Sequence, residues 1–296
     1  MNKKIIILFL LILLSLAGIF FGLAKTKVTT NSKNAETQYI KANDIKIAYK
    51  KFGKGDKTII MIMGYTGTMD LWNPPVLDKL AGQYQIVIFD NRGMGLTSAS
   101  EKEFSIDLFA DDVNLLMDKL NINNAHILGW SMGTEVALSF ATRYPEKLDK
   151  LILYAADCSF SQSVKPKNED LALITSDDPK DALRALIPND WLTLHPDPSE
   201  YFPILTEKSS EKNIKRQDEA MRKWQGVCNK LDLVKSPTML ITGTKDILTP
   251  PQNSLYLVNK IPNASLVQIP GGGHGLMFQF PNLFSNYVLT FLNNSE

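Results

Sequence analysis

Short apolar runs recur along the chain between longer stretches of mixed apolar and polar residues. The six central runs are Thr58–Met63, Gln85–Phe89, His126–Leu128, Leu151–Tyr154, Thr238–Thr242 and Ser265–Ile269. Runs this short and this uniformly apolar are typical of parallel strands buried on both faces. Two earlier runs, Gln38–Ala42 and Ile45–Tyr49, flank Asn43-Asp44 and predict an antiparallel hairpin at one edge of the sheet.

The stretches between these runs have apolar residues at helical spacing. The clearest are Ser105–Leu120, in which Ser105 is placed as an N-cap, and Met132–Tyr144, Gln252–Lys260 and Asn282–Asn293. Alternation of strand and helix predicts an α/β fold with a doubly wound, mostly parallel, eight-stranded sheet.

One segment, from Ser159 to about Leu231, contains no buried-strand run and is rich in proline and amphipathic sequence. A separate domain is one interpretation, but the strand pattern resumes afterwards, which an insertion explains better. We therefore expect one α/β domain over residues 37–296 with a helical cap inserted at about 159–231.

The N-terminal residues predict a targeting or anchoring segment. Lys3 and Lys4 precede an uncharged apolar run, Ile5–Ala24, as in a secretory signal. Its length matches the roughly 20 residues that span a bilayer, which favours an uncleaved anchor over residues 1–24. Residues 25–36 are polar and predict a linker. We expect the catalytic domain to lie outside the cytoplasm, either anchored to the membrane or secreted after signal cleavage.

Composition excludes some classes of function. The formal net charge is +1, with 32 basic and 31 acidic residues, which argues against a nucleic-acid partner. The histidines and cysteines show no metal-ligand spacing, and the sequence predicts neither a metal nor a cofactor. Cys158 and Cys228 flank the expected cap, either as a disulfide across its two ends or as free thiols.

Gly129-Trp130-Ser131-Met132-Gly133 fits the G-x-S-x-G pattern of a nucleophile, between a predicted strand and a predicted helix. The nucleophile must stand on a tight strand-to-helix turn, and glycines on both sides let neighbouring backbone come close. The helix N-terminus also places positive partial charge at the reacting centre. Ser131 is therefore the predicted nucleophile.

A serine hydroxyl needs a base, and the base needs an acid that fixes its tautomer. His274, in a glycine-rich loop after the last strand, is the predicted base, whereas His126 lies in a strand and His195 among prolines of the cap. Asp246 follows the strand Thr238–Thr242 and gives the order Ser, Asp, His. Asp157, after the strand Leu151–Tyr154, remains the alternative acid.

The oxyanion that forms during acyl transfer needs preorganised hydrogen-bond donors. The backbone N–H of Met132 and that of Tyr65, in the loop Gly64–Gly67, are the predicted pair.

With these motifs in place, the chain resembles the α/β-hydrolase superfamily, in its cap-bearing branch of small serine esterases. The resemblance covers roughly Tyr39 to Leu292 and rests on Gly64–Gly67, Asp90–Gly95, the Ser131 motif, and Gly243 to Asp246 with His274. Asp90-Asn91-Arg92-Gly93-Met94-Gly95 looks like the family's D-x-R-G-x-G turn, which implies a structural role for its Asp and Arg. The family commonly has His-Gly where this chain has Met63-Gly64. Serine rather than aspartate as nucleophile favours acyl transfer to water.

The predicted substrate is a small, apolar acyl compound. Trp72, Trp130 and Met94 are candidates to line its pocket, and Trp191, Tyr201 and Phe202 of the cap to close over it. A carboxylic ester is the leading substrate class. The alternatives are the substrates of proline-iminopeptidase-like peptidases, C–C hydrolases and lactonases. An alternative of another class is a ligand-binding protein without catalysis on the same scaffold.

Overall fold

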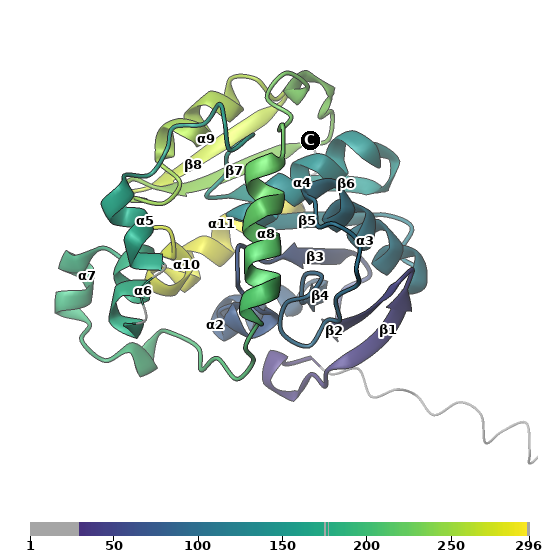
Figure 1. Cartoon of the computed structure of the whole chain (residues 1–296), viewed down its shortest axis with the longest axis horizontal. Helices are drawn as coiled ribbons and strands as arrows, with labels where there is room; N and C mark the ends of the chain where they lie inside the picture. Colours follow the sequence, from purple (N-terminus) through teal and green to yellow (C-terminus); the bar gives the residue numbers. More distant parts are fainter. Residues whose placement is uncertain (1–29, 175, 177, 295–296) are drawn as a thin grey trace, which may run out of the picture.

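Eight strands form one sheet in the order β1-β2-β4-β3-β5-β6-β7-β8 (Figure 1). The computed structural model describes residues 30–174, 176 and 178–294. The strands are β1 (Gln38–Ala42), β2 (Ile45–Gly53), β3 (Thr58–Ile62), β4 (Gln85–Phe89), β5 (Ala125–Trp130), β6 (Leu148–Tyr154), β7 (Thr238–Gly243) and β8 (Ala264–Ile269). β2 pairs antiparallel with β1 on one side and with β4 on the other, and every other neighbouring pair of strands is parallel. The predicted α/β sheet with an antiparallel hairpin at its edge is confirmed.

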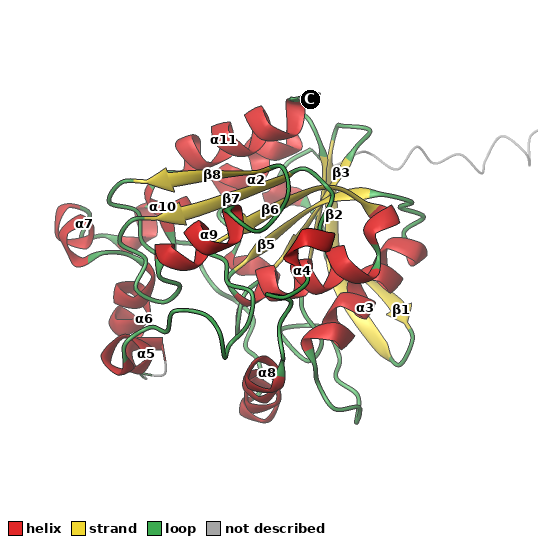
Figure 2. Cartoon of the chain, turned by 90° about the horizontal axis from the view of Figure 1, so that it is seen from above, coloured by secondary structure: helices red, strands yellow, loops and turns green. Residues whose placement is uncertain are grey.

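Helices cover both faces of the sheet (Figure 2). α3 (Ile106–Lys119), α4 (Met132–Arg143) and α9 (Pro251–Val258) pack on one face, and α2 (Pro74–Ala81), α10 (Leu276–Gln279) and α11 (Pro281–Asn293) pack on the other. Alternate residues of β3 pack against the helices of the two layers, because successive side chains of a strand point to opposite faces of the sheet. Ile60 and Ile62 face α3 and α4, whereas Ile59 and Met61 face α2 and α11.

Side-chain caps fix where α2 and α3 begin. The Ser105 side chain accepts a hydrogen bond from the N–H of Leu108 at 3.0 Å, as its predicted N-cap position requires. Asn73 caps α2 in the same way, with Pro74 at the first helical position. Hydrophobic periodicity does not predict α2, because the helix is short and begins with two consecutive prolines.

Helices α5 (Asn168–Ile174), α6 (Pro179–Leu186), α7 (Asn189–Leu194) and α8 (Glu211–Lys223) lie in the chain between β6 and β7. Figure 1 shows α8 crossing in front of the sheet, with the other three grouped beside it. We call residues 159–231 the cap segment. Short 3-10 helices occur at Ser32–Asn34, Met69–Leu71, Pro145–Lys147, Pro198–Glu200 and Leu231–Leu233.

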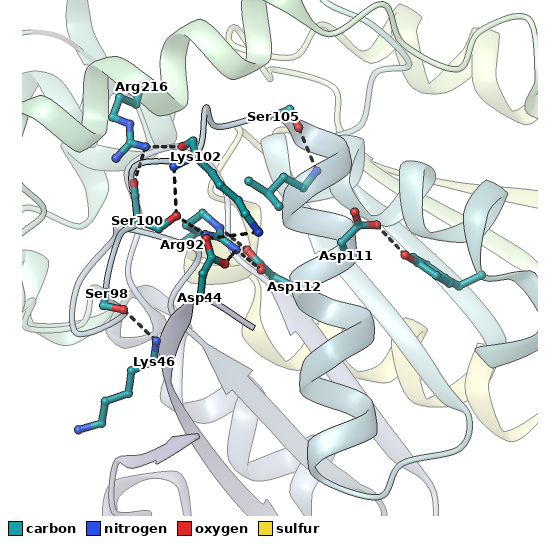
Figure 3. A network of polar contacts seen from close by, with 12 residues as sticks. Asp44, Lys46, Arg92, Ser98, Ser100, Lys102, Ser105, Asp111, Asp112 and Arg216 are labelled. Atoms are coloured by element: carbon teal, nitrogen blue, oxygen red, sulfur yellow. Dashed lines mark hydrogen bonds and ion pairs between the residues drawn. The ribbon is translucent and has the colours of Figure 1, made fainter. Parts of the chain in front are cut away.

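A polar network around Arg92 joins α8 to the body of the domain (Figure 3). The fully buried guanidinium of Arg92 donates to both oxygens of Asp112 on α3, at 2.8 and 2.6 Å, and to Asp44 in the hairpin turn at 3.1 Å. Arg216 of α8 donates to the carbonyl oxygens of Ser100 and Lys102 in the adjacent loop. Asp90 accepts hydrogen bonds from the N–H groups of Met69 and Leu96, at 2.7 and 2.9 Å. The Asp and the Arg of the D-x-R-G-x-G turn therefore both make structural contacts.

A disulfide joins Cys158 to Cys228, 70 residues apart, at the two ends of the cap segment. The N–H of Val227 also donates to the Cys158 carbonyl at 2.9 Å. Gly226 lies so close to Ser159 that a Cβ at position 226 would stand 2.1 Å from the Ser159 Cβ. Of the two states considered for these cysteines, the structure has the bridged one.

The apolar run Ile5–Ala24, predicted as a signal or an anchor, lies outside the described residues. Within the ranges that the structure describes, none of the helices has both the length and the apolar character needed to cross a membrane. Ser32, inside the predicted linker, is held against α2, because its N–H donates to Asp78 at 2.7 Å.

Candidate active site

Ser131 stands on a strained turn between β5 and α4. Its backbone has φ 55° and ψ −125°, a conformation that an L-residue adopts only when its surroundings enforce it. Gly129 and Gly133 make the turn possible. A Cβ at Gly129 would lie 2.3 Å from the Gly133 carbonyl oxygen, and one at Gly133 would lie 2.2 Å from that of Ile62. The sequence pattern and the local geometry therefore agree at this position.

Hydrogen bonds on both sides hold the turn. The N–H of Ser131 donates to the Tyr154 carbonyl at 2.9 Å, and the Ser131 carbonyl accepts from both the N–H and the hydroxyl of Thr134 at 2.7 Å. The predicted oxyanion loop, Gly64–Gly67, passes close to the side chain of Ser131. A Cβ at Gly64 would lie 3.1 Å from the Ser131 Cβ, so a larger residue there would crowd the hydroxyl.

Asp246 and His274 lie side by side in the structure. His274 Nδ1 is 3.0 Å from Asp246 Oδ2 and 3.1 Å from Oδ1, and both side chains are buried. Asp246 Oδ1 also accepts hydrogen bonds from the N–H groups of Leu248 and Thr249, at 3.0 and 2.8 Å. These bonds orient the carboxylate toward the imidazole and favour the tautomer with the proton on Nδ1.

The glycine-rich loop that carries His274 is fixed on several sides. A Cβ at Gly243 would lie 2.1 Å from the Gly272 carbonyl oxygen, so the loop of Asp246 and the loop of His274 touch through backbone. The N–H of Gly273 donates to Gln279 Oε1 at 2.7 Å. The N–H of Gly275 donates to the carbonyl of Leu186 in the cap segment, also at 2.7 Å.

Two aromatic side chains bind the main chain of His274 itself. The Tyr154 hydroxyl donates to the His274 carbonyl at 2.6 Å, and the Trp130 indole N–H donates to the same oxygen at 3.1 Å. The two rings are stacked, with centroids 5.6 Å apart and planes 8° from parallel. Complete burial raises the pKa of Tyr154 well above its ordinary value, so the phenol keeps the proton it donates. Sequence reasoning missed this role of Tyr154.

Ser131 and His274 line one cavity of about 330 Å³. Most of its wall is apolar, from both the sheet domain and the cap segment, and includes Leu71, Trp130, Ile174, Leu183, Leu186, Phe202, Leu205 and Leu248. Of the three predicted pocket residues, Trp130 lines this cavity, while Trp72 and Met94 are fully buried and are not part of its wall. Trp72 packs instead against Trp130, with ring centroids 6.1 Å apart.

The two predicted oxyanion donors are free to bind a ligand. Among the hydrogen bonds of the described residues, none uses the N–H of Tyr65 or that of Met132. Gln217, a fully buried residue of α8, holds the loop next to Tyr65, because its Oε1 accepts from the N–H of Thr66 at 2.8 Å. Thr66 has a positive φ of 60°, so the loop needs such a restraint.

Asp157, the alternative acid, faces another carboxyl group. Its side chain lies within hydrogen-bonding reach of Glu135 on α4, and no hydrogen bond joins it to His274 in the described part of the chain. Burial raises the pKa of both carboxyl groups, that of Glu135 most. Among the described residues, no group of three or more His, Cys, Asp or Glu side chains is arranged to hold a metal ion.

Comparison with known proteins gives consistent results. A family model described as alpha/beta hydrolase fold matches residues 57–182 and 194–281. A putative carbamate hydrolase, RutD of Caulobacter sp. (strain K31), is 26% identical over 245 residues, which are 80% of this chain and 91% of RutD. Serine hydrolase BPHL of Mus musculus is 25% identical over 261 residues, 86% of this chain and 85% of its own. An alpha/beta hydrolase fold protein from Chitinophaga pinensis has a TM-score of 0.76 at 24% identity, covering 90% of this chain and 99% of its own.

Proposed function

The chain belongs to the alpha/beta-hydrolase fold family, and from that premise we propose that it is a serine hydrolase of carboxylic esters or related acyl compounds. Ser131 is the nucleophile, His274 the general base and Asp246 the acid that orients it. The observation that carries the proposal is the buried contact of 3.0 Å between His274 Nδ1 and Asp246, beside a cavity that His274 shares with Ser131. Such a contact leaves His274 Nε2 unprotonated, as a base must be.

In the proposed reaction, Ser131 Oγ attacks the acyl carbon and its proton passes to His274 Nε2. The carbonyl oxygen becomes an oxyanion, which the N–H groups of Tyr65 and Met132 stabilise. His274 then gives the proton to the leaving alcohol, and an acyl-enzyme remains. Water repeats the sequence with the same histidine as base, which releases the acid and restores Ser131.

The cavity supports an apolar acyl or alcohol group as one arm of the substrate. Its wall is predominantly aliphatic and aromatic, and burial of each CH₂ group of a ligand contributes about 0.8 kcal/mol. Lactones and carbamates share the reaction chemistry. Proteins named for these activities are among the similar sequences and structures, such as RutD and an enol-lactonase from Burkholderia xenovorans LB400. The substrate panel should therefore include both, with thioesters and peptides.

The test is covalent labelling of the full chain with a fluorophosphonate, followed by hydrolysis of the panel. We expect labelling of wild type and loss of both labelling and hydrolysis in Ser131→Ala, with kcat/KM lower by roughly 10⁴-fold or more. Ser139→Ala, which changes a serine inside α4, is the matched control and should still be labelled. A folded wild-type protein without labelling or hydrolysis would favour the ligand-binding alternative.

We also propose that residues 1–24 direct the domain out of the cytoplasm and anchor it in the membrane. The disulfide between Cys158 and Cys228 supports this, because such bonds persist in oxidising compartments. Fractionation of cells that express the full chain tests it. Recovery in the membrane pellet is expected, recovery in the culture medium would indicate cleavage, and recovery in the cytoplasm would contradict export.

A further inference from the structure

A second, smaller chamber adjoins Ser131, and we call it the carboxyl chamber. Its volume is about 120 Å³, and it shares Ser131 and Tyr65 with the larger cavity. Glu135 of α4 and Asp157, which follows β6, both line it. A substrate whose carbonyl carbon lies at Ser131 can therefore extend one arm into each space.

The two carboxyl groups of this chamber lack donors from the protein. Glu135 is only 2% exposed, and Glu135 Oε2 and Asp157 Oδ1 are buried atoms without a hydrogen-bond partner in the described part of the chain. Buried polar atoms are nearly always hydrogen-bonded, and an unpaired one is costly. Two carboxyl groups within reach of each other can share one proton, but their other lone pairs still lack donors.

The pair carries negative charge, and Lys165, which also lines the chamber, acts on it without forming an ion pair with either acid in the described part of the chain. Burial raises the pKa of both carboxyl groups. Two carboxyl groups this close titrate as a pair, which holds one proton and one negative charge between them. Lys165 is the cation whose charge acts on both carboxyl groups. Its ammonium lies over the Phe160 ring, 3.2 Å from the centroid, and donates no hydrogen bond to either acid. The charge of a protonated His274 also acts on Asp157.

We propose that the carboxyl chamber is a substrate subsite for a protonated primary amine, so that the enzyme prefers acyl compounds with one short arm ending in an ammonium group. An ammonium has three donors and no acceptor, which complements a carboxyl pair that has only acceptors to offer. The volume equals that of about four waters at roughly 30 Å³ each, enough for a short aminoalkyl arm. This inference rests on the proposed function, since it assigns one arm of the substrate of Ser131.

Two pairs of esters test the inference. Benzyl 3-aminopropanoate against benzyl butanoate places the amine on the acyl arm, and 3-aminopropyl hexanoate against butyl hexanoate places it on the alcohol arm. Each pair differs only by an ammonium in place of a terminal methyl group. For the arm that enters the chamber, we expect wild type to prefer the ammonium ester by roughly ten- to a hundredfold in kcat/KM.

The variants Glu135→Gln and Asp157→Asn, separately and together, remove the charge with little change of shape. We expect the preference to fall to near unity in the double variant. The readout is a ratio of two substrates on one enzyme sample, so a reduced folded fraction does not affect it. Glu207→Gln is the matched control, because Glu207 is an acid that lines the larger cavity only, and its preference should stay within about threefold of wild type.

The possible results distinguish failure of the amine subsite from failure of the proposed serine hydrolase activity. Equal hydrolysis of both members of each pair, with hydrolysis lost in Ser131→Ala, would overturn the amine subsite and leave the serine hydrolase standing; the chamber would then hold only water. Loss of the preference in Glu207→Gln rather than in the carboxyl pair would also overturn it. Absence of all Ser131-dependent hydrolysis would overturn both proposals.

Discussion

The hydroxyl of Tyr154 donates a hydrogen bond of 2.6 Å to the main-chain carbonyl of His274, across 120 residues of sequence. The same oxygen of Tyr154 accepts from the N–H of Met277 at 3.3 Å. Tyr154 ends β6, so this one side chain joins a central strand to the loop of the proposed base. The position of His274 therefore depends on the core as well as on Asp246.

Tyr154→Phe should test this dependence. The change leaves the N–H of Met277 unpaired in the core and removes one of two donors to His274, so we expect a loss of about 1–3 kcal/mol in the free energy of unfolding. We also expect kcat to fall several-fold, because the imidazole is less well oriented. Urea denaturation and ester kinetics measure the two effects. Tyr287→Phe on α11, where Tyr287 is 38% exposed, is the control and should change neither.

Gln217 should control the oxyanion loop from the cap segment. Gln217→Met removes the acceptor of the Thr66 N–H while keeping the side-chain length, so the neighbouring N–H of Tyr65 should shift away from the oxyanion. We expect kcat to fall about ten- to a hundredfold with a smaller change in KM, since the donor acts mainly in the transition state. Gln225→Met, at an exposed glutamine just after α8, is the matched control. Equal kinetics of the two variants would contradict this role.

The sequence predicts the sheet more closely than the environment of the site. β1 and β4 begin and end at the predicted residues, because short apolar runs between turn signals report burial on a sheet directly. The G-x-S-x-G turn follows equally from local sterics at Gly129 and Gly133. The contacts Tyr154–His274 and Thr66–Gln217 join residues 120 and 151 positions apart, so no local pattern contains them. The sequence also could not place Trp72 and Met94 correctly. Their apolar side chains predict burial, but they do not show whether a residue lines the cavity or packs in the core behind its wall.

The disulfide should contribute substantially to stability. It closes a loop of 70 residues, for which the chain-entropy model gives about 4 kcal/mol as an upper value. We expect reductant to lower the Tm of wild type and to lower the free energy of unfolding by about 2–4 kcal/mol. The double variant Cys158→Ala/Cys228→Ala should resemble reduced wild type and be insensitive to reductant. A Tm that reductant does not change in wild type would contradict the prediction.

Asp90 should make stability fall as the pH rises. Burial raises its pKa from 3.8 to about 6, although both oxygens accept backbone hydrogen bonds, from Met69 and Leu96. Between these values the folded state holds a proton that the unfolded chain has lost, so the free energy of unfolding falls from pH 4 to pH 6 and then levels. The contribution is on the order of 3 kcal/mol, at 1.36 kcal/mol per pKa unit. Asp90→Asn should lack it, as urea denaturation at pH 4.5 and 7.5 would measure; parallel pH dependence of the two proteins would refute the assignment.

Asp246 and Asp157 should differ sharply in their effect on hydrolysis of a neutral ester. Asp246 contacts His274 at 3.0 Å, so Asp246→Asn should favour the wrong tautomer and lower kcat by about 10⁴-fold. Asp157 faces Glu135 instead, so Asp157→Asn should lower kcat far less, by about tenfold at most. Both are buried-carboxylate-to-amide changes and serve as controls for each other. Hydrolysis of butyl hexanoate by the two variants decides between the acids. If Asp157→Asn were the inactive one, the acid of the site would be the residue after β6, and the carboxyl chamber would be part of the catalytic machinery rather than a subsite.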